Sequence, residues 1–205
     1  IKKNINLKKR KIKLLEDANY YSEEVRKDLL KKYGFDKIYK DGLNIKTPLD
    51  PNYQIQAIKA LRNGLERYDK RKGWRGVLLN KKNNSNWQNG LEEFKLEDSV
   101  NWNLAIVKKI NFFEIEIEIE NKEKGKIRLD SINWIKKNFN DFLKIGDVIY
   151  VKKINKNLWD LKQLPKANGS VVVMDPYTGR VLSLVGGYSY KISEFNRATQ
   201  AFRQP

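Results

Sequence analysis

The chain has 205 residues, carries a formal net charge of +17 and contains neither His nor Cys. Without imidazole or thiol side chains, it cannot hold a Ser-His-Asp triad, a catalytic cysteine, a zinc site built on His or Cys, or a disulfide. Hydrophobic residues make up 40% of the chain, enough for a core in one large domain or two small ones. No apolar run predicts a membrane span. Because the chain begins at Ile1 without a signal-peptide pattern, we expect it to be a piece of a longer protein.

The positive charge is concentrated near the N-terminus. Residues 1–75 carry 21 basic and 10 acidic side chains, residues 76–164 carry 16 and 13, and residues 165–205 carry 5 and 2. We interpret the most basic stretch, residues 1–13, as a solvated arm or linker, with contact to anionic lipid headgroups as the alternative. The chain has 32 Lys and 22 Asn, so a general compositional bias explains much of the charge and makes it weak evidence for a polyanion partner.

The first predicted elements are a helix and a short strand. Ser22 is a suitable cap for a helix that ends at Gly34. The spacing of three apolar side chains predicts its buried stripe, formed by Val25, Leu29 and Tyr33. Residues 43–47 alternate apolar and polar side chains, which predicts a short strand that Pro48 ends.

A second helix is predicted to begin at Asp50 and Pro51. Asp at the cap accepts hydrogen bonds from the first backbone N–H groups, and Pro at the first helical position lacks an N–H that would otherwise need a partner. The apolar residues recur at helical spacing as far as Lys70, at Ile55, Ile58, Leu61, Leu65 and Tyr68.

From Gly76 onward, short alternating patterns predict a β-rich unit. Residues 113–120 alternate strictly between apolar and acidic side chains, and residues 126–129 come after a turn, so a hairpin with opposite charges facing each other is predicted. Further strands are expected over residues 104–110, 148–153 and 158–164, and a short helix over residues 132–139. About five short strands in a segment of this length suggest a small closed barrel, for which the OB-fold is the economical candidate.

Two apolar runs near the C-terminus predict another hairpin. Residues 171–174 and 181–185 flank the turn-forming sequence of residues 175–179. Because both runs are apolar on both faces, we expect the hairpin to belong to a sheet covered on both sides, which this chain is too short to cover by itself.

The segment after this hairpin resembles a known family. It contains Gly186-Gly187-Tyr188, then residues 195–201 with the sequence FNRATQA, and it ends in Arg-Gln-Pro at residues 203–205. This pattern resembles the stretch that immediately precedes the active-site serine in class A, bifunctional penicillin-binding proteins. The resemblance continues elsewhere, with the family's linker at residues 18–26, its first transpeptidase strand at residues 42–50, and the end of the OB-like domain of 1A-type members at residues 142–148 and 159–165.

The resemblance implies an α+β architecture in which a small OB-like β-barrel is inserted between discontinuous helix and strand segments of a penicillin-binding transpeptidase domain. Residues 1–75 would form the linker and the first strand and helix of that domain, residues 76–164 the OB-like insert, and residues 165–205 the beginning of the central sheet. The implied function is that of a non-catalytic part of a bifunctional peptidoglycan synthase, which has glycosyltransferase and D,D-transpeptidase activities as a whole.

The resemblance also implies a location and partners. The whole protein would act on the periplasmic side of the bacterial inner membrane, held by an anchor outside this chain. The expected partners are peptidoglycan and cell-wall-synthesis proteins, with no nucleic acid among them. Because the insert is near charge balance and would interrupt a catalytic domain, we hypothesise that it is a partner-docking or regulatory module, with the acidic ladder of residues 114–120 as one candidate contact surface.

The family's catalytic chemistry is not expected within this chain. Family members acylate a serine in a Ser-x-x-Lys motif, helped by Ser-x-Asn and Lys-Thr-Gly motifs. We expect none of these three motifs in the chain, where no serine has Lys three residues later and Lys-Thr-Gly is absent. Tyr177-Thr178-Gly179 is similar to the last motif without its Lys, and we interpret it as a turn. We therefore assign no catalytic, cofactor-binding or metal-binding residue and expect no cofactor, and whether the piece is an enzyme stays open.

Three other interpretations compete with this one. Carboxylates on alternate residues of a strand, about 6.6 Å apart, fit glycoside hydrolysis, but nothing in the pattern keeps one of them protonated, so a solvated strand face is preferred. Four tryptophans suit stacking on sugars or bases, although barrel core and rim are preferred for Trp87, Trp102, Trp134 and Trp159. An OB-fold nucleic-acid-binding module with a basic N-terminal arm is the alternative function, but it requires a cationic groove in a unit whose charge is nearly balanced.

The resemblance also predicts how the parent chain continues beyond Pro205. A serine with Lys three residues later should occur within about a dozen residues, at the start of a helix. Sequencing the parent gene tests this directly, and a continuation without that pattern would contradict the family resemblance.

Overall fold

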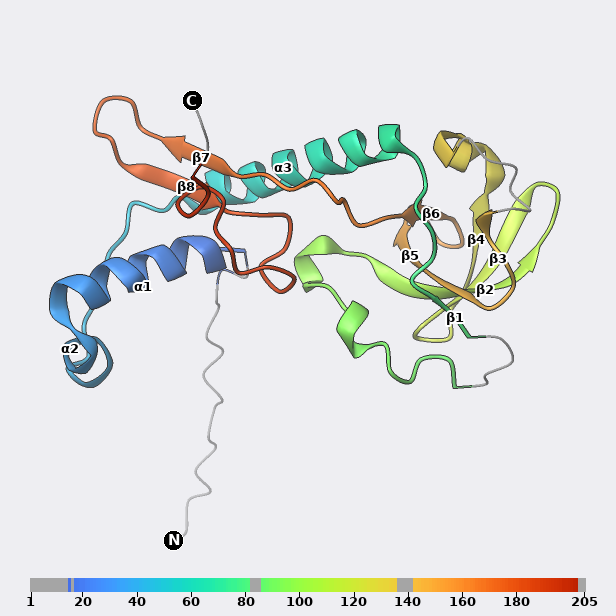
Figure 1. The fold of residues 1–205 in the computed structure, drawn as a ribbon, viewed down its shortest axis with the longest axis horizontal. Coiled ribbons are helices and arrows are strands. Elements are labelled where there is room, and N and C mark those ends of the chain that lie inside the picture. Colours follow the sequence, from blue (N-terminus) through green and yellow to red (C-terminus); the bar gives the residue numbers. More distant parts are fainter. Residues whose placement is uncertain (1–14, 16, 82–85, 136–141, 203–205) are drawn as a thin grey trace, which may run out of the picture.

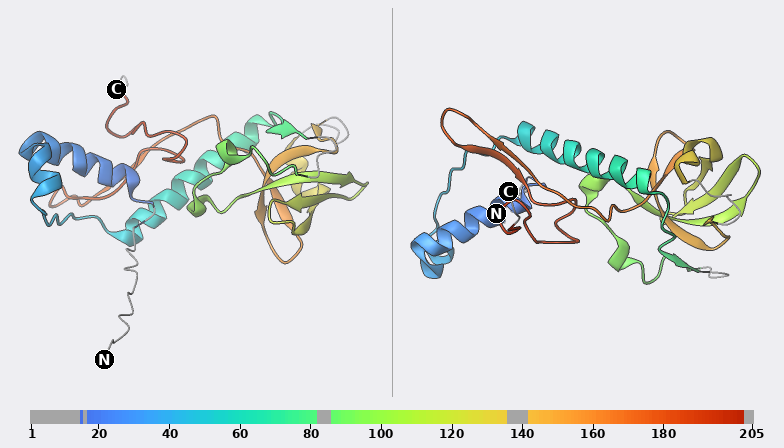
Figure 2. Two further views of the ribbon diagram at one scale, coloured as in Figure 1. Left: turned by 90° about the horizontal axis from the view of Figure 1, so that it is seen from below. Right: turned by 45° about the horizontal axis from the view of Figure 1, so that its top comes forward.

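The computed structural model describes residues 15, 17–81, 86–135 and 142–202. It is an elongated α+β fold with one sheet at each end, and helix α3 (Pro51–Lys72) runs between the two sheets in every view (Figures 1 and 2). The predicted α+β class is confirmed. The basic arm of residues 1–13 lies outside the described residues. Across the described ranges, no helix combines the length and hydrophobicity that crossing a lipid bilayer requires.

The larger sheet has six antiparallel strands and contains the predicted OB-like strands. Their order is β1-β5-β2-β3-β4, and β6 pairs with β5 along the same edge as β1. The bounds are β1 Leu79–Asn80, β2 Asn103–Ile110, β3 Glu114–Ile119, β4 Lys124–Arg128, β5 Asp147–Lys153 and β6 Trp159–Lys162. A 3-10 helix, Leu129–Ile135, occupies the start of the predicted helix over residues 132–139, whose remainder lies outside the described residues.

The expected closure of this sheet into a barrel is wrong. Strands β4 and β6 approach each other from opposite ends of the sheet, but in place of a ladder there is an isolated parallel bridge from Lys126 of β4 to Leu158, the residue before β6. Strand β4 has five residues and β6 has four, and β6 uses its length to pair with β5. The sheet is therefore a partly open barrel, a form that OB-folds commonly take.

The predicted charged hairpin is confirmed together with its register. Glu114, Glu116 and Glu118 of β3 lie opposite Arg128, Lys126 and Lys124 of β4. The isoleucines between them are buried in the interior of the sheet, with Trp159 and Leu161 of β6 among their neighbours. Strict alternation thus places one face of the hairpin in the core and leaves a row of alternating charges on the other.

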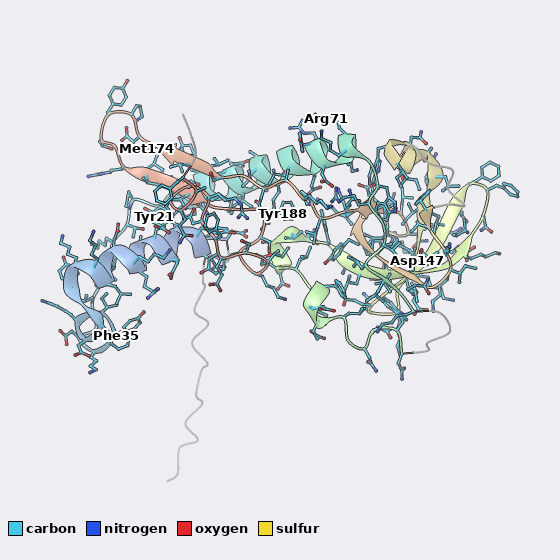
Figure 3. The ribbon with its side chains drawn as sticks, viewed as in Figure 1. Tyr21, Phe35, Arg71, Asp147, Met174 and Tyr188 are labelled. Atoms are coloured by element: carbon cyan, nitrogen blue, oxygen red, sulfur yellow. The ribbon has the colours of Figure 1, made fainter. Side chains whose placement is uncertain are left out.

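The smaller sheet is the predicted C-terminal hairpin, β7 (Val171–Met174) and β8 (Val181–Val185). Helix α1 (Asn19–Tyr33) packs on one face of β8 and α3 on the other, with Leu184 against Tyr21 and Val185 against Ile58. Figure 3 shows Tyr21 beside this hairpin and Met174 on its outer strand. The expected double cover is present for β8, and helices of this chain supply it, so the expectation that the chain is too short to cover the hairpin is wrong for this strand. Met174 on β7 is 55% exposed.

Two predictions near the N-terminus are wrong. Helix α1 begins after Ala18 rather than at Ser22, and Tyr33, expected in the buried stripe, is 42% exposed. The buried residues of α1, Tyr20 and Tyr21, both lie in its first turn, and a further short helix, α2 (Phe35–Lys40), comes after Gly34. Residues 43–47 form no strand, because the segment buries no apolar face that would hold it against a partner.

Helix α3 begins as predicted but buries a partly different face. The Asp50 carboxylate accepts hydrogen bonds from the backbone N–H groups of Asn52 and Tyr53, at 2.7 and 3.2 Å. Ile58 is buried, whereas Ile55 and Tyr68 of the predicted stripe are 37% and 42% exposed. Polar side chains occupy both ends of the buried face instead, at Gln54 and Asp69.

Asp69, near the end of α3, links this helix to the two chain segments that lead into and out of the larger sheet. This carboxylate is 3% exposed. It accepts hydrogen bonds from Arg75 Nη1 at 2.7 Å, from Gln163 Nε2 at 2.7 Å and from the backbone N–H of Lys166 at 3.2 Å. A buried carboxylate needs such a full set of donors, and these donors come from both chain crossings. Asp69 therefore fixes the entry and the exit of the β-rich unit to one helix end.

Replacing Asp69 with Ala should lower the free energy of unfolding by about 2 to 3 kcal/mol, because it leaves the three donors without their acceptor. Asp36→Ala is the matched control, since the Asp36 carboxylate is 78% exposed and forms a surface ion pair with Lys40. Its effect should stay within about 0.5 kcal/mol. Urea unfolding of both variants measures the difference, and equal effects would contradict the proposed tie.

Candidate functional site: the tyrosine-glycine junction and the charged hairpin

The segments that carry the sequence motifs meet at one junction. Tyr20, at the start of α1, reaches the segment after β8, where its hydroxyl donates to the carbonyl oxygens of Ser189 at 3.2 Å and Ser193 at 2.6 Å. Its ring packs edge-on against Tyr190, with centroids 4.9 Å apart. Burial raises the pKa of Tyr20 to about 12, so the hydroxyl stays protonated and donating at neutral pH.

Two glycines let the chain pass this tyrosine. A Cβ atom on Gly186 would lie 2.4 Å from Asn196 Oδ1 and 2.7 Å from Tyr20 Cδ1, and one on Gly187 would lie 2.5 Å from the Tyr20 hydroxyl oxygen. Carbon atoms do not approach non-bonded neighbours this closely. The Gly-Gly pair is therefore a packing requirement of the junction, set by Tyr20 and Asn196.

Asn196 folds the segment after these glycines back onto the junction. Its side chain donates to Glu24 Oε1 of α1 at 3.2 Å and accepts from the backbone N–H of Ala198 at 3.0 Å. The backbone N–H of Arg197 donates to the carbonyl of Gly186 at 3.0 Å. Residues 195–201 are thus positioned by helix α1 and by the glycines together.

Helix α3 supplies the polar groups beneath the junction. Gln54, fully buried, donates to the carbonyls of Asp17 and Leu184 and accepts from Ser183 Oγ and the Leu184 N–H, at 2.8 to 3.1 Å. All four hydrogen-bonding positions of its amide are used. Gln54 therefore links the segment just before α1, helix α3 and strand β8 through one side chain.

Tyr188 connects the junction to the larger sheet. Its hydroxyl donates to Glu66 Oε1 at 3.0 Å, and burial together with the Glu66 charge raises its pKa far above the usual range. Its carbonyl accepts from Arg62 Nε at 2.9 Å, and the same guanidinium donates to Ser99 Oγ at 3.1 Å. Figure 3 shows Tyr188 between the two sheets, below α3. The junction thereby contacts the β-rich unit as well as its own sheet.

The contacts at the junction are structural rather than catalytic in kind. Two tripeptides match the Ser-x-Asn motif, beginning at Ser99 and Ser131, which corrects the expectation that no part of the family's motif set occurs. Ser99 accepts from Arg62 and Ser131 donates to the Arg128 carbonyl, so each hydroxyl has a structural partner. Thr178 donates to Asp175 at 2.6 Å within the β7–β8 turn. Among the described residues, no group of three or more acidic side chains is placed to hold a metal ion.

The carboxylates of the charged hairpin are neutralised by neighbours. Lys126 Nζ lies 2.6 Å from Glu114 Oε1, and Lys108 Nζ lies 3.3 Å from Glu118 Oε2. Burial raises the pKa of Glu118, but the hydrogen bond from Trp87 and the charge of Lys108 outweigh it, and the pKa lies below its usual range. Glu118 is therefore ionised at neutral pH, which does not suit the general acid that glycoside hydrolysis needs.

The four tryptophans are divided between core and rim. Trp87 and Trp159 are 0% and 2% exposed, and Trp102 and Trp134 are half-buried against the same two clusters. This distribution agrees with the preferred interpretation of these residues.

The polar residues of α3 were not anticipated from the sequence. Gln54 lies four residues before Ile58, and Asp69 lies four residues after Leu65, so both continue the buried stripe at helical spacing. The signal in the sequence was a polar residue at the helical spacing of an apolar stripe, which indicates a buried polar side chain. Its partners come from distant segments that no local pattern identifies.

Gly186→Ala should lower the free energy of unfolding by about 1 to 3 kcal/mol, because the added methyl group forces Asn196 or Tyr20 to move. Gly64→Ala is the control, since nothing lies within 4 Å of its Cβ position in the middle of α3. It should raise the stability by about 0.4 to 1 kcal/mol. Thermal and urea unfolding compare the two, and a neutral Gly186→Ala variant would show that the junction is loosely packed.

Comparison with known proteins places these features in a family. The family model described as "Penicillin-binding protein OB-like domain" matches residues 74–167. Proteins named penicillin-binding protein 1A are similar over nearly the whole chain, with 36% identity over 98% of the chain in Rickettsia bellii and 30% over 91% in Escherichia coli. The chain covers 26% and 24% of those two proteins, so it spans about a quarter of the curated relatives that it matches.

A solved structure supports the same assignment. The crystal structure of penicillin-binding protein 1A from Haemophilus influenzae superimposes with a TM-score of 0.75 at 32% sequence identity, and the match covers 89% of this chain and 28% of that one. Sequence and fold agree over both the β-rich unit and the junction. The chain belongs to the penicillin-binding protein 1A family.

Proposed function

We propose that this chain is a non-catalytic framework segment of a bifunctional peptidoglycan synthase that acts in bacterial cell-wall assembly. The observation that carries the proposal is the junction, where Gly186 and residues 195–201 are folded against Tyr20 and Glu24 of α1 and Tyr188 is held by α3. In the family, the stretch that resembles these residues leads into the catalytic serine. A rigid junction at this point would hold that serine in place without supplying chemistry of its own.

The proposal includes a division into three parts. Residues 1–75 and 165–205 would be discontinuous pieces of a transpeptidase domain and its linker, and residues 76–164 an OB-like unit inserted between them. The hydrogen bonds of Asp69 to Arg75, Gln163 and Lys166 support these limits, because they tie together the two points where the chain enters and leaves the unit.

The whole protein would have glycosyltransferase and D,D-transpeptidase activities and would work on the periplasmic side of the inner membrane. Peptidoglycan and cell-wall-synthesis proteins would be its partners, with the OB-like unit as the docking module. The alternative of a nucleic-acid-binding module has no support from this face, since Lys108 and Lys126 are paired with Glu rather than left to form a cationic groove.

Labelling with a fluorescent penicillin tests the proposal. The 205-residue chain should give no covalent band in denaturing electrophoresis, whereas its longer parent protein should give one. In the parent, Gly186→Ala should slow acylation by about tenfold or more, because the junction positions the serine. Gly64→Ala should leave the rate unchanged. A parent that is never labelled, or a labelled 205-residue chain, would overturn the proposal.

A further inference from the structure

The outer face of the charged hairpin forms an open groove of about 500 Å³. It runs across three strands, β2, β3 and β4, and reaches the loop between β5 and β6. The side chains that line it are Lys108, Glu116, Glu118, Lys124, Lys126 and Asn157. In the order β2 to β6, these five strands correspond to the five of an OB-fold, and the face of the second and third strands is the one with which OB-folds bind oligonucleotides and oligosaccharides.

The groove mixes both signs of charge, because its lining carries three lysines and two glutamates, and Glu114 pairs with one of those lysines. The ion pairs of Glu114 with Lys126 and Glu118 with Lys108 cross between neighbouring strands, and Glu116 accepts a hydrogen bond from Asn111 Nδ2 at 3.2 Å. The three glutamates on β3 would repel a polyanion, and the lysines beside them would repel a polycation. A neutral ligand rich in hydroxyl and amide groups uses both, because each such group donates to a carboxylate and accepts from an ammonium.

One carboxylate of the groove is held from inside the protein. Trp87 is completely buried, and its Nε1–H donates to Glu118 Oε1 at 2.7 Å. The Glu118 side chain is 25% exposed, so its carboxylate is fixed on one side and accessible on the other. A buried donor that orients a surface acceptor lowers the entropy lost when a ligand binds.

Exposed aromatic and apolar side chains lie in the two loops that correspond to those with which OB-folds bind their ligands. Phe112 and Phe113, in the β2–β3 loop, are each 85% exposed, and Ile154, in the β5–β6 loop, is 57% exposed. Asn111 connects the first loop to Glu116, and Asn157 of the second loop lines the groove itself. Flat apolar rings next to a row of hydrogen-bonding groups suit the ring faces and hydroxyl edges of a sugar chain.

We propose that this groove is a glycan-binding site that takes an extended, uncharged sugar backbone built from N-acetylated units. Glu118 and its neighbours on β3 and β4 contact the hydroxyl and amide groups, and the phenyl rings of the β2–β3 loop stack on sugar faces. That the natural ligand is the glycan backbone of peptidoglycan rests on the proposed function. The site itself rests only on the groove, its charges and its loops.

Titration of the 205-residue chain with a hexamer of β-1,4-linked N-acetylglucosamine, monitored by amide NMR, tests the proposal. Shifts should concentrate in β3, β4 and the two loops and depend little on salt, because the ligand is uncharged. The double variant Phe112→Ser/Phe113→Ser should raise Kd by about tenfold. Tyr177→Ser is the matched control, since Tyr177 is 96% exposed in the turn of the other sheet, and its Kd should equal that of the unchanged chain.

Three results would overturn the glycan site. They are the absence of groove shifts at millimolar hexamer, a Kd that the phenylalanine substitutions do not change, and tighter binding of single-stranded DNA on the same face with a steep salt dependence. If this face binds a protein instead of a glycan, the hexamer should cause no shifts in the groove. The hexamer titration reports on the groove, whereas penicillin labelling reports on the catalytic serine of the parent protein. Either test can therefore fail without the other.

Discussion

The structure depends on one buried carboxylate at the end of α3. Asp69 accepts a hydrogen bond from Arg75, where the chain enters the β-rich unit. It also accepts hydrogen bonds from Gln163 and Lys166, where the chain leaves that unit. An insert tied only by two covalent crossings would pivot about them, whereas three hydrogen bonds to one acceptor hold both crossings to the same helix end. Nearby ion pairs, Lys162 with Glu66 and Lys70 with Asp160, add further links between α3 and β6.

Helix α3 carries this constraint to the other end of the molecule. The side chain of Gln54, near the start of this helix, accepts a hydrogen bond from the Leu184 N–H of β8 and donates one to the Asp17 carbonyl. The helix therefore fixes the smaller sheet as Asp69 fixes the larger one. Tyr188 then bridges the two through Glu66. The junction that precedes the family's catalytic position and the groove on the charged hairpin are therefore parts of one framework, and a ligand held in the groove would have a defined direction relative to the junction.

Local patterns in the sequence predicted the elements whose cause is local. The charged hairpin and its register follow from strict alternation, and the start of α3 follows from Asp50 and Pro51, because each residue acts on its immediate neighbours. Two predictions that depended on distant partners were wrong. Residues 43–47 have the alternation of a strand without a surface to pair with, and the sheet stays open because an isolated bridge stands in place of a ladder between β4 and β6. Asp69, Gln54 and the groove required the tertiary structure, since their partners lie far away in the sequence.

The central claim is that Asp69 fixes the orientation of the β-rich unit. The chain contains no Cys, so spin labels at Tyr177→Cys and Phe112→Cys, exposed positions on the two sheets, report one distance only. Pulsed electron paramagnetic resonance should give a single narrow distance distribution in this double variant. The same labels combined with Asp69→Ala should give a broad one while both sheets remain folded. Distributions of equal width with and without Asp69 would contradict the account.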